Sequence, residues 1–127
     1  MKNNPDKPIV LLIDDDRQIR DVMQKALESS GYIALVAENG KVGMEIYRNE
    51  KPDIVITDLF MPEKEGLETI QEIRSINPDA KIIAISGGSV NTSLDFLPLA
   101  SKLGASAALE KPFSIAALIG EINKLID

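Results

Sequence analysis

The sequence predicts an α/β domain with a five-stranded parallel sheet that is covered by helices on both faces. Short apolar runs without polar interruptions, such as IVLLI at 9–13, are typical of strands buried on both sides. Between these runs lie longer segments whose apolar residues recur every three or four positions, as on one face of a helix. Strands that alternate with helices form right-handed parallel crossover units, so five such units are expected.

The first three units follow in order. Behind 9–13, an apolar helical face is formed by Ile19, Val22, Met23, Ala26 and Leu27, and Gly31 is placed to cap the end of that helix. The run 32–37 predicts the second strand, followed by a short helix over about 41–49. The third strand is expected at 53–57, and the helix at 66–76 stops before Asn77 and Pro78.

The last two units are less regular. The fourth strand is expected at 81–85 and a weak fifth strand at 106–109. Between them, Pro98 forbids a long ordinary helix, so we predict a short helix that starts near Phe96 with Asp95 as its N-cap. The final helix carries the apolar residues Ile115, Leu118, Ile119, Ile122, Leu125 and Ile126.

Composition restricts the function. The 127 residues suit one domain, residues 1–127, with a short polar tail at 1–7. The net charge of −6 disfavours direct binding to nucleic acid or to an anionic membrane. The chain has no cysteine and no histidine, which excludes disulfides, thiolate metal sites and the usual general base. No stretch has the pattern of a signal peptide or a membrane span, so a cytoplasmic location is expected.

Polar residues follow four of the five predicted strands. Asp14, Asp15 and Asp16 follow the first strand, Asp58 the third, Ser86 the fourth and Lys111 the fifth. In a parallel sheet the carboxyl ends of the strands meet at one edge, where ligands bind near the switch in strand order. These side chains are therefore expected to lie together.

The carboxylates have two explanations. An aspartate at a helix start stabilises free N–H groups by about 1 kcal/mol, and such capping accounts well for Asp16. Asp58, however, is followed by Leu-Phe-Met-Pro rather than by a helix. Mg²⁺ takes oxygen ligands and keeps several waters, so a cation held by Asp14, Asp15 and Asp58 is the favoured interpretation.

Lys111 and Ser86 each have an ordinary explanation, as a surface turn before Pro112 and as a strand-ending hydroxyl. Beside a cation and an aspartate, they would instead contact a phosphoryl group. The chemistry that needs all four positions is phosphoryl transfer to a carboxylate, which yields a labile acyl phosphate.

The chain resembles the receiver domains of response regulators, the CheY-like superfamily of two-component signalling. The motifs that carry this resemblance are LLIDDD at 11–16, IVITDLFMPEKEGLE at 54–68, IIAISGG at 82–88, LGA at 103–105 and LEKPF at 109–113. The resemblance implies a flavodoxin-like fold of doubly wound (βα)5 type with strand order 2-1-3-4-5. Since no output domain follows residue 127 in this sequence, we expect a stand-alone receiver if the sequence is complete.

The resemblance further implies roles for individual residues. Asp58 matches the phosphoacceptor, Ser86 the switch hydroxyl and Lys111 the lysine of the site. Mg²⁺, with Mn²⁺ or Ca²⁺ as substitutes, would be held by Asp15, by Asp58, by the backbone carbonyl of Phe60 and, through water, by Asp14. The implied donor is a phosphohistidine on a sensor histidine kinase or a histidine phosphotransfer protein, and the implied output is a changed surface for an unidentified downstream protein.

Three features depart from the family pattern. Ala108 stands where an aromatic residue usually reports phosphorylation. The segment 86–104 is longer than usual, and neither Phe60 nor Gly88 has a side chain that holds an attacking water, which predicts a long-lived phosphoryl group.

Three other functions compete with a phosphorylated receiver. A Mg²⁺-dependent phosphohydrolase of the haloacid-dehalogenase type would be an enzyme, but Gln18 and the lack of an acidic pair after Lys111 do not fit its motifs. A receiver-like module that is never phosphorylated would have lost part of the site. A flavin-binding protein is disfavoured by an aromatic content of 4%. We therefore expect self-phosphorylation and autodephosphorylation but no enzymatic turnover of a substrate.

Overall fold

The computed structural model describes residues 7–59, 66–86, 104–110 and 113–126. These ranges contain one parallel sheet with the strand order β2-β1-β3-β4-β5, as predicted. The strands are β1 (Ile9–Ile13), β2 (Ile33–Ala37), β3 (Ile54–Asp58), β4 (Ile82–Ser86) and β5 (Ala107–Glu110). The predicted positions of β2 to β5 are each displaced by about one residue, which is the usual uncertainty of a strand boundary.

The described ranges hold four helices, α1 (Arg17–Ser29), α2 (Gly40–Glu50), α3 (Gly66–Ile76) and α5 (Ile115–Ile126). Asp16 caps α1 as expected, because its side chain accepts hydrogen bonds from the backbone N–H groups of Gln18 and Ile19. The end of α1 is a Schellman turn in which Gly31, at φ 94°, lies just beyond the cap residue Ser30. The short helix predicted near Phe96 lies outside the described residues.

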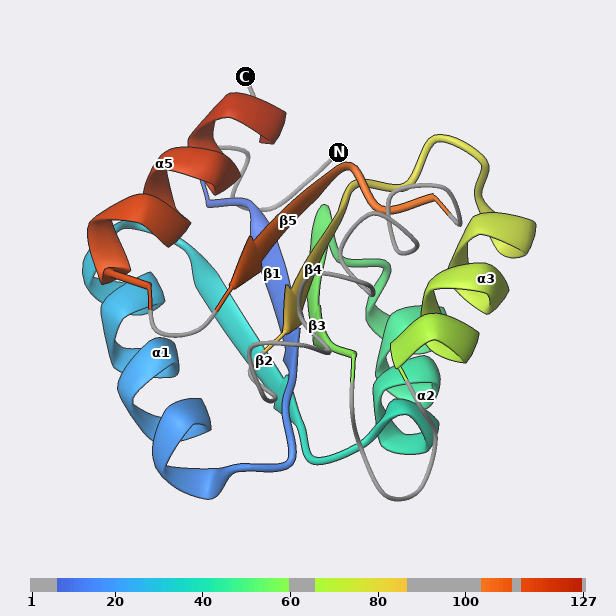
Figure 1. The fold of residues 1–127 in the computed structure, drawn as a ribbon, viewed down its shortest axis with the longest axis horizontal. Helices are drawn as coiled ribbons and strands as arrows, with labels where there is room; N and C mark the ends of the chain where they lie inside the picture. The colour runs from blue at the N-terminus through green and yellow to red at the C-terminus, as the bar shows by residue number, and fades with distance from the viewer. Residues whose placement is uncertain (1–6, 60–65, 87–103, 111–112, 127) are drawn as a thin grey trace.

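The helices cover the sheet in pairs. Figure 1 shows α1 and α5 on one face and α2 and α3 on the other, as expected for a doubly wound fold. No helix in the described part of the chain combines the length and the apolar composition needed to cross a bilayer.

Two separate apolar cores result, one on each face of the sheet. In β1, Leu11 and Ile13 face α2 and α3, whereas Val10 and Leu12 face α1 and α5. The strands β3 and β4 alternate in the same way, so the central strands are buried on both faces. This explains why their sequences are continuous apolar runs rather than alternating ones.

Candidate functional site

Asp14 is the first residue after β1, and its backbone and side chain are both held in place. Its N–H donates to the carbonyl oxygen of Ala37 (3.1 Å). Its own carbonyl oxygen accepts from Nη1 of Arg20 (2.8 Å), and its Oδ1 accepts from the N–H of Asp16 (2.9 Å). Asp14 is fully buried. The structure therefore presents its carboxyl group in a defined orientation at the edge of the sheet.

Asp58 is the last residue of β3, the strand next to β1. It is only 6% exposed, and the register of the two strands pairs Ile13 with Thr57, so Asp14 and Asp58 continue from paired positions. The hydroxyl of Thr57 donates to the carbonyl oxygen of Asp58 (3.1 Å). The strand order reverses between β1 and β3, so both residues lie at the switch point of the sheet.

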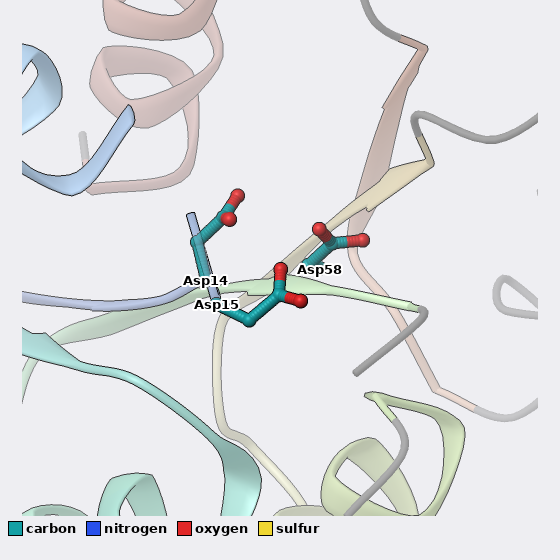
Figure 2. Close-up of side chains that lie close together, drawn as sticks. All are labelled: Asp14, Asp15 and Asp58. Atoms are coloured by element: carbon teal, nitrogen blue, oxygen red, sulfur yellow. The ribbon is translucent and has the colours of Figure 1, made fainter. Parts of the chain in front are cut away.

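Asp15 joins these two residues in one cluster. Carboxylate oxygens of Asp14, Asp15 and Asp58 all lie within 4.8 Å of one another, and Figure 2 shows the three side chains grouped at the ends of β1 and β3. Asp14 and Asp58 are buried, whereas Asp15 is exposed. Sequence reasoning predicted that these three side chains meet, and the structure brings them together.

The donor set fits a hard divalent cation. Two unit charges about 4 Å apart repel by about 1 kcal/mol in water and by about 4 kcal/mol near a protein surface. Mg²⁺ prefers oxygen ligands and binds through few carboxylates while keeping several waters. Three clustered carboxylates supply the oxygen ligands, and the exposure of one of them leaves room for the waters. A cation bound there would also offset their repulsion.

Asp16 has a different role from its two neighbours. Its Oδ1 caps α1, and it is not part of the cluster. Asp16→Ala should lower the free energy of unfolding by about 1 kcal/mol, because a capping acceptor is lost. The backbone bond from residue 16 to Asp14 is retained in this variant, so we expect the dissociation constant for Mg²⁺ to change by no more than about twofold. Chemical denaturation and calorimetric titration check the two values, and a large loss of Mg²⁺ affinity would contradict the capping assignment.

The remaining predicted site residues are described only in part. Ser86 ends β4, one position beyond the residue paired with Asp58, but its side chain lies outside what the structure describes. Phe60, Gly88 and Lys111 also lie outside the described residues. Their assigned roles stay predictions. Ala108 is an exposed residue of β5, at the position where the family usually carries an aromatic side chain.

Two further residues support the site and were not found from the sequence. Arg20 holds the carbonyl of Asp14, six positions before it in the chain. Gly66 begins α3, and its N–H donates to the carbonyl oxygen of Leu59 (3.0 Å), which brings α3 against the end of β3. No periodic pattern marks either residue, because each contact depends on how a helix is placed against the sheet.

A flavodoxin-like sheet with clustered carboxylates at the switch between β1 and β3 defines the receiver-like class of α/β domains. The family model described as response regulator receiver domain matches residues 10–123. The chain therefore belongs to the response regulator receiver family.

Individual relatives agree with this assignment. The chain is 36% identical over 118 residues to the chemotaxis protein CheY of Thermotoga maritima, which covers 91% of this chain and 95% of that protein. It is 30% identical over 118 residues to the response regulator MprA of Mycolicibacterium vanbaalenii, which covers 92% of this chain but 49% of that protein. The chain thus spans about half the length of MprA.

Solved structures give the same fold. The crystal structure of a response regulator receiver domain protein from Clostridium thermocellum superposes with a TM-score of 0.86 at 34% identity, and 94% of each chain is covered. The predicted fold class and family are therefore both confirmed.

Proposed function

We propose that this chain is a phosphoacceptor receiver and that Asp58 receives the phosphoryl group. One observation carries this assignment: a buried carboxylate at the end of β3 lies within 4.8 Å of the carboxylate oxygens of Asp14 and Asp15. A nucleophilic carboxylate that must attack an anionic phosphoryl group needs its neighbours' negative charge offset by a cation. The acidic pair beside Asp58 is suited to hold that cation.

The proposed reaction moves one phosphoryl group between proteins. A carboxylate oxygen of Asp58 forms a bond to phosphorus, the bond between phosphorus and the partner's histidine nitrogen breaks, and that nitrogen keeps the electron pair. The donor histidine must lie outside these 127 residues, because they contain no histidine. Bound Mg²⁺ supplies positive charge to the phosphoryl oxygens.

The chain's own residues have separate parts in this proposal. Asp15, Asp58 and the carbonyl of Phe60 would hold the cation, and Asp14 would contribute through water. Lys111 and the hydroxyl of Ser86 contact the phosphoryl oxygens and orient the group. We further propose that the chain catalyses no sustained turnover beyond its own phosphorylation and dephosphorylation.

The output of the proposed switch is a change of surface. A phosphoryl group adds negative charge and hydrogen-bond acceptors at one place, which biases the protein between two conformations. The partners are a sensor histidine kinase or a histidine phosphotransfer protein upstream and a protein target downstream. Ala108 has no aromatic ring to change position, so the coupling to that target differs from the usual one.

The test is phosphorylation by a small donor. Incubation with acetyl phosphate and Mg²⁺ should add one phosphoryl group, and tandem mass spectrometry should locate it at Asp58. Omission of Mg²⁺ with added chelator should prevent the modification. Phosphate attached at another residue, or continuous release of phosphate as in a hydrolase, would overturn the assignment. The modified form should persist long enough to isolate, as expected from Phe60 and Gly88.

A further inference from the structure

Arg20 makes an unusual contact for a residue of a surface helix. It lies in the first turns of α1, is half-buried, and its Nη1 donates to the carbonyl oxygen of Asp14 at 2.8 Å. Its backbone N–H donates to the carbonyl oxygen of Asp16 at 3.0 Å. This second bond is the ordinary i to i−4 bond of a helix, so the contact particular to Arg20 is the one from its side chain to the residue before Asp15. A hydrogen bond from a charged donor is stronger than a neutral one, so this contact restrains the segment that carries the acidic pair.

The restrained atom is part of the peptide that leads into Asp15. The carbonyl of Asp14 and the N–H of Asp15 share one planar unit, so fixing the carbonyl oxygen also fixes the direction in which the chain enters Asp15. The Asp15 side chain is exposed, and no hydrogen bond or ion pair holds it within the described part of the chain. The position of its carboxylate therefore depends on the backbone that Arg20 holds.

We propose that Arg20 is a positioning residue for the cation site, a role that rests on the proposed function of that site. By holding the peptide between Asp14 and Asp15, it presets the separation of two carboxylates that must bind one ion together. Preset ligands bind more tightly because less ordering remains to be done on binding.

The positive charge of Arg20 makes this proposal easy to distinguish from a purely electrostatic role. A cation near a cation site repels the incoming ion, so removal of the charge alone should tighten Mg²⁺ binding. Loss of positioning should weaken it. The sign of the change in the dissociation constant therefore separates the two effects.

Arg17 is a matched control on the same helix. It lies one turn earlier, its side chain is 85% exposed, and it approaches Asp21 at 4.0 Å in an exposed pair. Arg17→Gln removes one positive charge from the first turn of the same helix but leaves the carbonyl of Asp14 bound. Any general effect of charge on Mg²⁺ binding appears in this variant as well.

The experiment is a Mg²⁺ titration followed by the backbone amide NMR signals of residues 14–16. Arg20→Gln should raise the dissociation constant about five- to tenfold, which corresponds to the loss of one charge-assisted hydrogen bond. Arg20→Met should behave in the same way. Arg20→Lys keeps a charged donor and should restore the constant to within about threefold of the wild type, whereas Arg17→Gln should leave it unchanged or lower it.

A second readout separates positioning from general stability. At saturating Mg²⁺, the rate of phosphorylation by acetyl phosphate should return to within about twofold of the wild type, because the ion itself then orders the two carboxylates. If Arg20→Gln binds Mg²⁺ as well as the wild type or better, or changes only the melting temperature, the positioning role is wrong. If the wild-type amide signals do not respond to Mg²⁺, the proposed cation site is wrong, and the positioning role of Arg20 is then wrong as well.

Discussion

Replacing Gly66 with alanine should lower the free energy of unfolding by about 3 kcal/mol or more, the largest stability effect that we expect from a single methyl group. A Cβ atom at this position would lie 2.0 Å from the carbonyl oxygen of Asp58 and 2.6 Å from the Cα atom of Leu59. Both contacts are with backbone, so no side-chain rotation relieves them. Either α3 must move away from the sheet or the end of β3 must shift.

The matched control is Gly120→Ala, within α5. There an added Cβ meets no atom within 4 Å, so alanine should stabilise the protein by about 0.5–1 kcal/mol. Urea unfolding of both variants gives the two values. A Gly66→Ala protein as stable as the wild type would show that α3 does not pack this closely on β3. Since β3 ends in Asp58, phosphorylation should also be slowed in any Gly66→Ala protein that remains folded.

The second large effect is expected from Asp58→Asn. This variant should lose all phosphorylation by acetyl phosphate, because an amide is not a nucleophile at neutral pH. In a chelating buffer it should nevertheless be more stable than the wild type by about 1–2 kcal/mol, because one of three clustered negative charges is gone.

Mg²⁺ should make the wild type more stable than Asp58→Asn, the reverse of their order in chelator. At a hundredfold excess over its dissociation constant, a ligand that binds only the folded state stabilises it by about 2.7 kcal/mol, and the wild type should gain most of this while Asp58→Asn gains less. Thermal unfolding with and without Mg²⁺ measures both trends. Asp79 is exposed and lies just before β4, at the opposite edge of the sheet from the site. Asp79→Asn removes the same charge and should change stability neither in chelator nor on addition of Mg²⁺. If Asp58→Asn is destabilised in chelator as well, repulsion within the cluster is not a significant term.

The fold was predictable because its strongest sequence signals are local. The runs that became β1, β3 and β4 are continuous and apolar since both faces of each strand are buried, and the alternation of strand and helix patterns along the chain predicts a parallel sheet covered by helices. The two ends of α1 were also predictable from the sequence, because Asp16 and Gly31 are typical capping residues. The strand limits were less accurate, because strand ends depend on backbone pairing across the sheet rather than on side-chain type.

The site was predictable only as far as strand ends determine it. Asp14, Asp15 and Asp58 were expected to meet because parallel strands end at one edge, and they do. The contact from Arg20 depends on the angle at which α1 leaves the loop, and the need for glycine at position 66 depends on how closely α3 approaches β3. These are properties of packing between elements, which single-sequence patterns do not encode. The roles of Ser86, Phe60 and Lys111 remain predictions.

The two cores on opposite faces of the sheet have a consequence for the register in which β1 pairs with its neighbours. A slip of one residue in β1 would exchange the side chains of the two cores, and because both cores are apolar, this exchange would disturb the packing but would not expose apolar residues to water. The same slip, however, would carry the Asp14 carboxyl group, which is buried beside the N–H of Asp16 and the other site carboxylates, into the apolar surroundings of Ile13 between the sheet and α2. We therefore expect Asp14 to disfavour misalignment of β1, and an apolar residue at position 14 should make incorrect pairing of β1 during folding more frequent.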